Sequence, residues 1–192
     1  MSLLPTSPSS NIITHTSSFA RRSFKELVAE RDAIKNKKET THTSKREEVQ
    51  REDGGGSSGS FSVGYMPTSG GSQQPASNAT FPRLVKAAFA LERALLPDRE
   101  PSSTIAINRN AQFRPHTDSG AGAGQSLSLI VALGDFVGGE LMVEGTREDI
   151  RYMPVEFDGW KQRHYTLPFA GERFSLVWFT PKGCENMKGV DL

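Results

Sequence analysis

The chain has 192 residues, of which 35% are hydrophobic and 23% are charged, and its formal net charge is +1. That length accommodates one domain with an appendage, and the low hydrophobic content indicates that part of the chain does not fold. The charge balance lacks the basic excess of an electrostatic nucleic-acid binder. The sequence contains no run of roughly 18 apolar residues, so it predicts no membrane-spanning helix.

The N-terminal segment and the single cysteine bear on localisation. Residues 1–24 are rich in Ser and Thr and carry Arg21 and Arg22 without an acidic residue, which resembles an organelle transit peptide. A plain disordered tail fits the same composition. Cys184 is the only cysteine, so an internal disulfide is excluded and a reducing compartment is indicated. We expect a soluble intracellular protein of the cytoplasm or nucleus, with an organelle as the alternative.

The first 80 residues are expected to contribute little to the folded domain. Residues 23–39 predict a short charged helix with few apolar anchors. Residues 54–80 are rich in Gly, Ser and Pro, and such a segment buries too little apolar surface to offset the entropy of ordering. We therefore expect a largely disordered tail and linker over residues 1–80 and a folded domain over residues 81–185.

One helix and six strands are predicted beyond the linker. Residues 81–96 place Phe, Leu, Val and Ala side chains on one helical stripe, with Thr80 as N-cap and Pro97 ending the helix. The predicted strands, rich in β-branched and aromatic residues, span 103–109, 125–133, 139–144, 149–154, 162–169 and 172–180. Short strands behind one supporting N-terminal helix predict a mainly β fold of the sandwich or jelly-roll type.

Two histidines and one aspartate suggest a metal site. His116 and Asp118 are two residues apart, so an extended backbone places both side chains on one face. His164 is the only other histidine after residue 80. Two histidines and a carboxylate are the facial ligand set of non-haem Fe(II) oxygenases. The alternative is that His116 and Asp118 cap a turn while His164 is a half-buried core residue.

A second polar pair follows on the last predicted strand. Arg173 and Ser175 share one face of the apolar sequence "RFSLVWF", and a guanidinium beside a hydroxyl suits a carboxylate ligand. A surface arginine on an edge strand is the alternative. The apolar surroundings disfavour it, because a buried arginine needs an anionic partner.

The order and spacing of these motifs resemble the Fe(II)/2-oxoglutarate-dependent dioxygenase superfamily, whose core is a double-stranded β-helix. "GDFVGGELMVE" (134–144) is similar to a strand of that family, and "INRNAQF" (107–113) is similar to a strand whose polar side chains help to hold 2-oxoglutarate. A narrower likeness is to orphan algal and protist sequences near the TET/JBP-like nucleobase oxygenases. The resemblance covers about residues 81–180.

The resemblance implies a role for each of these residues. His116, Asp118 and His164 would bind Fe(II) and form the catalytic centre. Arg173 would pair with the distal carboxylate of 2-oxoglutarate. The residues implied to assist it are Ser175, Asn108 and Asn110. Ascorbate is a further cofactor that the family uses.

The expected activity is hydroxylation or oxidation of an unidentified substrate, with succinate and CO₂ as co-products. A protein side chain, a nucleobase and a small metabolite all stay open as substrates, although the charge balance gives nucleic acid no support. Two other functions stay open: a non-catalytic β-helix module that binds a carboxylate or a partner, and a cupin-like metal-binding domain. The Arg173 and Ser175 pair separates the last from an oxygenase, since only a carboxylate co-substrate needs it.

Overall fold

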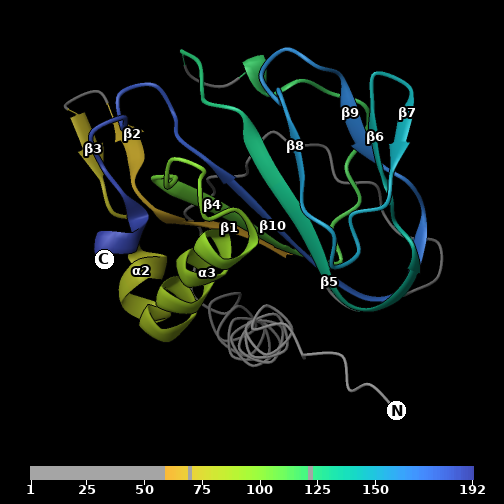
Figure 1. Cartoon of the computed structure of the whole chain (residues 1–192), viewed down its shortest axis with the longest axis horizontal. Coiled ribbons are helices and arrows are strands. Elements are labelled where there is room, and N and C mark those ends of the chain that lie inside the picture. Colours follow the sequence, from red (N-terminus) through yellow and green to blue (C-terminus); the bar gives the residue numbers. More distant parts are fainter. Residues whose placement is uncertain (1–58, 69–70, 121–122) are drawn as a thin grey trace, which may run out of the picture.

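Antiparallel sheets and one substantial helix make up the part of the chain that the structure describes (Figure 1). The computed structural model describes residues 59–68, 71–120 and 123–192. The segment that resembles a transit peptide and the charged helix expected at 23–39 lie outside these residues. The predominance of strands confirms the mainly β class predicted from the sequence.

The larger sheet has five strands in the order β1-β4-β10-β5-β8, and every neighbouring pair is antiparallel. Its strands are β1 Gly59–Gly64, β4 Thr104–Arg109, β5 Ser128–Gly138, β8 Val155–Phe157 and β10 Phe169–Phe179. The long strands β5 and β10 lie at the centre of this sheet, so side chains of β10 are flanked by strands on both sides.

The smaller sheet has the order β7-β6-β9 and is also antiparallel. Figure 1 shows its strands on the right, on the opposite side of β5 and β10 from the helices. The remaining elements are short. The strands of the smaller sheet are β6 Leu141–Val143, β7 Thr146–Glu148 and β9 His164–Thr166. The other short elements are the hairpin of β2 Met66–Thr68 and β3 Gly71–Gln73, the helix α2 Ala76–Thr80, and the 3-10 turns η1 Asp118–Gly120 and η2 Gly189–Asp191.

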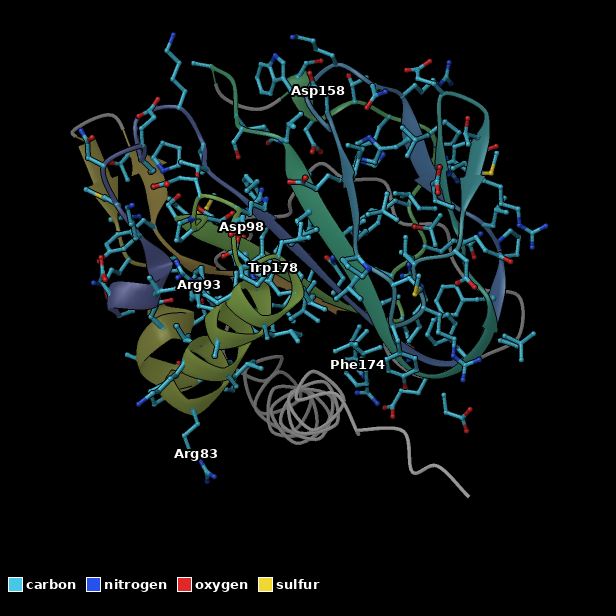
Figure 2. The ribbon with its side chains drawn as sticks, viewed as in Figure 1. Arg83, Arg93, Asp98, Asp158, Phe174 and Trp178 are labelled. Carbon is cyan, nitrogen blue, oxygen red and sulfur yellow. The ribbon has the colours of Figure 1, made fainter. Side chains whose placement is uncertain are left out.

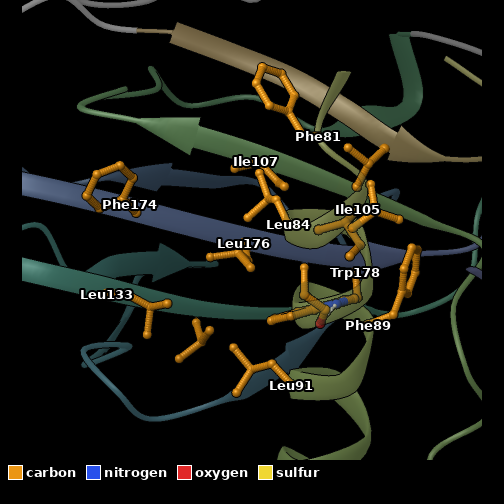
Figure 3. Close-up of a cluster of buried hydrophobic side chains, with 14 of the residues drawn as sticks. Phe81, Leu84, Phe89, Leu91, Ile105, Ile107, Leu133, Phe174, Leu176 and Trp178 are labelled. Atoms are coloured by element: carbon orange, nitrogen blue, oxygen red, sulfur yellow. Dashed lines mark hydrogen bonds between the residues drawn. The ribbon is translucent and has the colours of Figure 1, made fainter. Parts of the chain in front are cut away.

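Helix α3, Pro82–Leu95, covers one face of the large sheet. Figure 3 shows its apolar side chains packed against β4 and β10, and Trp178 donates a hydrogen bond from Nε1 to the carbonyl of Ala88 at 3.2 Å. Figure 2 shows Arg83 extending from the other side of the helix. No helix among the described residues is both long and apolar enough to span a membrane.

The start of α3 differs from the prediction. Thr80 does not cap this helix, because it is the last residue of α2 and its hydroxyl donates to the carbonyl of Ala76. Phe81 occupies the N-cap position without a side-chain hydrogen bond, and Pro82 begins the helix. Proline suits the first turn, since its missing N–H would have no intrahelical acceptor there.

The two faces of the large sheet carry different side chains because strand residues alternate. On β10, Phe174, Leu176 and Trp178 are fully buried against α3. Arg173 and Ser175, which alternate with them along the strand, therefore point toward the smaller sheet. A second apolar cluster fills the space between the sheets; it comprises Ile130, Ala132, Phe136, Leu141, Val143, Ile150, Phe157 and Phe169.

The expected linker over residues 54–80 is wrong where the structure describes it, from residue 59 onward. Residues 59–64 form β1, which pairs with β4 along its whole length, from Gly59 opposite Arg109 to Gly64 opposite Thr104. Phe61 and Val63 pack on the core of α3. Composition favoured a linker, but main-chain hydrogen bonds to β4 and two apolar side chains suffice to bind this segment to the sheet. The folded unit therefore includes residues before 81.

Five of the six predicted strands overlap observed ones, namely β4, β5, β6, β9 and β10. The exception is 149–154, where only Arg151 pairs, through an isolated parallel bridge to Ala132. Tyr152 has a φ of 58°. A strand cannot continue through that left-handed conformation, which explains the failure of the prediction.

Candidate metal and carboxylate site

His116, Asp118 and His164 come together as the sequence spacing suggested. One potential ligand atom from each residue lies within 4.8 Å of the other two. The main chains of His116 and His164 form an isolated antiparallel bridge, with N–H to carbonyl distances of 3.0 and 2.9 Å. That bridge sets the imidazole rings side by side, with centroids 4.3 Å apart. Two residues 48 positions apart in the chain thus share one site.

The same nitrogen of each imidazole, Nδ1, lies next to a main-chain carbonyl oxygen. Nδ1 of His116 lies 2.7 Å from the carbonyl oxygen of Arg114, and Nδ1 of His164 lies 3.0 Å from that of Gln162. A carbonyl only accepts, so each Nδ1 carries the proton and each Nε2 keeps its lone pair. This is how metal-binding histidines are oriented by their outer contacts. These residues therefore fit a divalent metal ion.

Asp118 is fixed by contacts that the sequence did not reveal. Its main-chain N–H donates to the carbonyl of Gly159 at 2.8 Å. Gln125 donates from Nε2 to Asp118 Oδ2 at 3.1 Å and contacts Ser128 Oγ at the same distance. Oδ1 is then left 3.6 Å from Nε2 of His116. One carboxylate oxygen is held by the protein, and the other faces the histidines.

Glycine at position 159 lets the chain pass close to Asp118. A Cβ atom there would lie 2.8 Å from Asp118 Oδ2 and 3.0 Å from Ser128 Oγ. Neither atom could move away without breaking its contact to Gln125. The Asp158-Gly159 turn signal in the sequence therefore marks both a chain reversal and the close approach that seats the carboxylate. In Figure 2, Asp158 marks this loop at the top of the molecule.

The three residues open onto a pocket between the two sheets. Phe157 packs edge-on against His164 with ring centroids 4.9 Å apart. Apolar and aromatic side chains dominate the lining, and the polar ones come mostly from the large sheet and β9. The lining residues are Ala106, Asn108, Phe113, His116, Asp118, Ile130, Leu141, Phe157, His164, Tyr165, Thr166, Ser175, Val177 and Phe179.

Arg173 is buried without an acidic partner. Its side chain is 1% exposed, its Nε has no hydrogen-bond partner, and no described carboxylate lies within 4.0 Å of its guanidinium. The rings of Phe136 and Phe169 flank it instead, with centroids 5.7 and 5.4 Å from Cζ. Burial lowers the pKa of Arg173 to about 10, partly offset by the charge of Glu140. A buried guanidinium without a described acidic partner suits an anionic ligand.

The main chain around Arg173 is closely packed. A Cβ atom at Gly139 would lie 3.0 Å from both Cδ and Nε of Arg173, and Gly139 has a φ of +75°. Glycine therefore serves two purposes there, a left-handed turn and the passage of the arginine side chain. The predicted "GDFVGGEL" motif contributes directly to the placement of the guanidinium.

The two asparagines predicted near Arg173 differ in position. Asn108 lines the pocket and is 2% exposed. Asn110 does not line it: its Oδ1 accepts from the main-chain N–H of Arg173 at 2.9 Å, and its own N–H donates to the carbonyl of Arg173. Asn110 thus contacts the main chain of Arg173 and is not proposed as a direct ligand of the co-substrate. Ser175 lines the pocket, and Arg173 lies two residues before it on the same strand face.

Comparisons with known proteins bear on the fold. No protein-family model matches the sequence, and a search of curated proteins finds no match. The solved structure of NgTET1 in complex with 5mC DNA covers 85% of this chain and 69% of its own at 13% identity, with a TM-score of 0.52. A 2OG-Fe(II) oxygenase family protein from Burkholderia pseudomallei covers 79% and 77% at 22% identity, with a TM-score of 0.40. A Pseudomonas putida prolyl-4-hydroxylase covers 87% and 88% at 19% identity, with a TM-score of 0.40. The likeness to NgTET1, together with the facing antiparallel sheets, confirms the predicted double-stranded β-helix.

Proposed function

We propose that this protein is an Fe(II)- and 2-oxoglutarate-dependent oxygenase. The observation that carries the proposal is the combination of two features between the same two sheets. One is a cluster of two histidines and an aspartate in which each imidazole directs Nδ1 at a main-chain carbonyl, and the other is a buried guanidinium without a described acidic partner. The first suits a metal, and the second suits a carboxylate.

The metal ligands would be His116, Asp118 and His164. Two neutral imidazoles and one carboxylate leave other coordination positions open, as in non-haem Fe(II) oxygenases. The chemistry that bound Fe(II) supplies is the coupling of O₂ reduction to the oxidative decarboxylation of 2-oxoglutarate, which yields succinate and CO₂ and oxidises a second substrate. The chain itself orients the ligands through the carbonyls of Arg114 and Gln162.

Arg173 and Ser175 would bind the distal carboxylate of 2-oxoglutarate, and Asn108 would support them. Three observations favour these residues: the burial of Arg173, the position of Ser175 in the pocket lining, and their common strand face. Phe136 and Phe169 stabilise the guanidinium without neutralising it, because an aromatic face attracts a cation but offers no hydrogen-bond acceptor of full strength. The arginine keeps its Nε donor for the co-substrate.

The substrate side of the pocket is aromatic. Phe113, Phe157 and Tyr165 line it together with the two histidines. Such a lining favours a substrate that presents an apolar or planar group to the metal, whether a protein side chain, a nucleobase or a small metabolite carries that group.

The test uses the full chain with Fe(II) and 2-oxoglutarate mixed without oxygen. We expect a visible absorption band that needs both components, and succinate once O₂ is admitted, even without a second substrate. The matched control is the same protein loaded with Zn(II), which should bind without producing succinate. A protein that gives neither the band nor succinate with Fe(II) is not a 2-oxoglutarate oxygenase; metal binding without any effect of 2-oxoglutarate would favour the cupin-like alternative.

Gln125 provides a prediction about the metal ligands. Substitution of Gln125 by Leu should weaken Mn(II) binding by roughly 10- to 100-fold, because outer contacts of metal ligands are typically worth that much. The cause is that Asp118 Oδ2 loses the amide that orients it. Titration calorimetry of the full chain measures the change. Gln112→Leu makes the same substitution at another glutamine and should bind Mn(II) as the wild type does. Equal affinity in the Gln125 and Gln112 variants would contradict the role of Gln125.

A further inference from the structure

Three polar side chains form a row across the large sheet on its pocket face. Ser60 of β1 is opposite Asn108 of β4, and Asn108 is opposite Ser175 of β10. Directly opposed residues of antiparallel strands project to the same side and lie within reach of one another. Ser60 Oγ is 2.6 Å from Asn108 Oδ1, and Asn108 Nδ2 is 3.2 Å from Ser175 Oγ. The row thus connects an outer strand of the sheet to the pocket.

The direction of these hydrogen bonds follows from a neighbouring main-chain carbonyl. Asn108 Nδ2 also lies 3.5 Å from the main-chain carbonyl oxygen of Ser175. A carbonyl only accepts, so this neighbour favours the amide nitrogen on the β10 side and would repel the amide oxygen. Oδ1 then faces β1, where it needs a hydrogen-bond donor. The Ser60 hydroxyl supplies it as a donor, and both ends of the amide are satisfied.

This direction decides what Ser175 offers to a ligand. Its Oγ accepts from Asn108, which leaves the hydroxyl proton free to point elsewhere. Asn108 and Ser175 are each 2% exposed, so bulk water does not compete for these contacts. Ser175 lines the pocket. Two residues away on the same face, Arg173 also offers only donors.

We propose that Ser60 is a positioning residue that fixes Ser175 as a hydrogen-bond donor toward the distal carboxylate of the bound co-substrate. The inference rests on the proposed function and extends it to a strand that lies before residue 81. Ser175 lines the pocket and Arg173, which is not among the lining residues, lies two positions before it on the same strand face; with both donating, they select a group with acceptors only. A carboxylate meets that requirement, whereas an amide or an ammonium group places a donor against a donor.

The experiment measures 2-oxoglutarate binding by calorimetry to the full chain loaded with Mn(II), without oxygen. Ser60→Ala should weaken binding by roughly 3- to 10-fold, the value of one ordinary hydrogen bond. Ser175→Ala should weaken it by roughly 10- to 100-fold, since that hydroxyl contacts a charged group. Ser60→Thr keeps the hydroxyl and should bind as the wild type does. Ser62→Ala removes a hydroxyl from the same strand and face, opposite Ala106, and should have no effect.

The double variant separates a positioning role from a general effect on the fold. Because Ser60 acts through Ser175, Ser60→Ala combined with Ser175→Ala should bind no more weakly than Ser175→Ala alone. Additive losses, or equal losses in the Ser60 and Ser62 variants, would overturn the inference. Thermal unfolding of each variant detects loss of β1 from the sheet. Failure of the wild-type chain to bind 2-oxoglutarate would instead refute the proposed function itself.

Discussion

An Arg173→Met variant is expected to lose 2-oxoglutarate affinity while becoming more stable to unfolding. Binding should weaken by roughly 30- to 5,000-fold, the equivalent of roughly 2–5 kcal/mol for truncation of one partner of a buried charge pair. Methionine has a similar length and fits between Phe136 and Phe169, where the guanidinium now lies. It leaves the metal ligands untouched, so Mn(II) binding should be unchanged.

The gain in stability follows from the pKa of the arginine. That pKa falls from its higher value in the unfolded chain to about 10 on folding because burial disfavours the charged form. Between these values the unfolded chain holds a proton that the folded chain has released, so the free energy of unfolding rises with pH over that window. Below pH 10 the folded state bears the whole cost of the charge, which is on the order of 3 kcal/mol. An apolar side chain removes that cost.

Two measurements check this prediction. Calorimetry gives the affinities for 2-oxoglutarate and Mn(II), and denaturant unfolding at neutral pH gives the stability. Arg93→Met, on the exposed face of α3, is the matched control and should change neither quantity (Figure 2). If Arg173→Met instead lowered stability and left 2-oxoglutarate affinity intact, the arginine would be a structural residue with a partner inside the protein.

A His164→Ala variant is expected to lose metal binding. Mn(II) affinity should fall by more than roughly 100-fold, beyond the loss caused by removing an outer contact of a ligand. Two ligands from one short segment, His116 and Asp118, would remain. The bridge between residues 116 and 164 uses main-chain atoms only, so the substitution does not remove it.

Calorimetric titration with Mn(II) measures this loss, and far-ultraviolet circular dichroism verifies that the fold persists. The control replaces His15 and His42, the two histidines outside the cluster, by alanine. That double variant removes more imidazoles than His164→Ala and should bind Mn(II) as the wild type does. Retention of metal affinity in His164→Ala would show that the cluster is not the metal site.

Local sequence patterns were sufficient for most of the sheet and for the choice of site residues. Alternation along "RFSLVWF" predicted a strand with Arg173 and Ser175 on one face, and the period of two makes that outcome independent of the rest of the fold. The two-residue spacing of His116 and Asp118 likewise predicted that their side chains share one face. His164 could be added because the chain offers no other histidine after residue 80.

Contacts between distant segments decided the rest, because composition does not record them. The Gly- and Ser-rich residues that predicted a linker include β1, whose pairing with β4 joins Ser60 to a residue 48 positions later. Gln125 reaches Asp118 across a glycine-rich loop, and nothing in its own neighbourhood marks it.

The sequence by itself determined that this protein is a mainly β domain carrying two histidines, an aspartate and an arginine suited to metal and carboxylate. Only the tertiary structure decided which nitrogen of each imidazole carries the proton, since that depends on the carbonyls beside each ring. It also decided that Arg173 is surrounded by aromatic rings, with no described acidic partner. Residue types specify which chemistry is available, and the packing of distant strands determines which of their polar atoms remain unpaired.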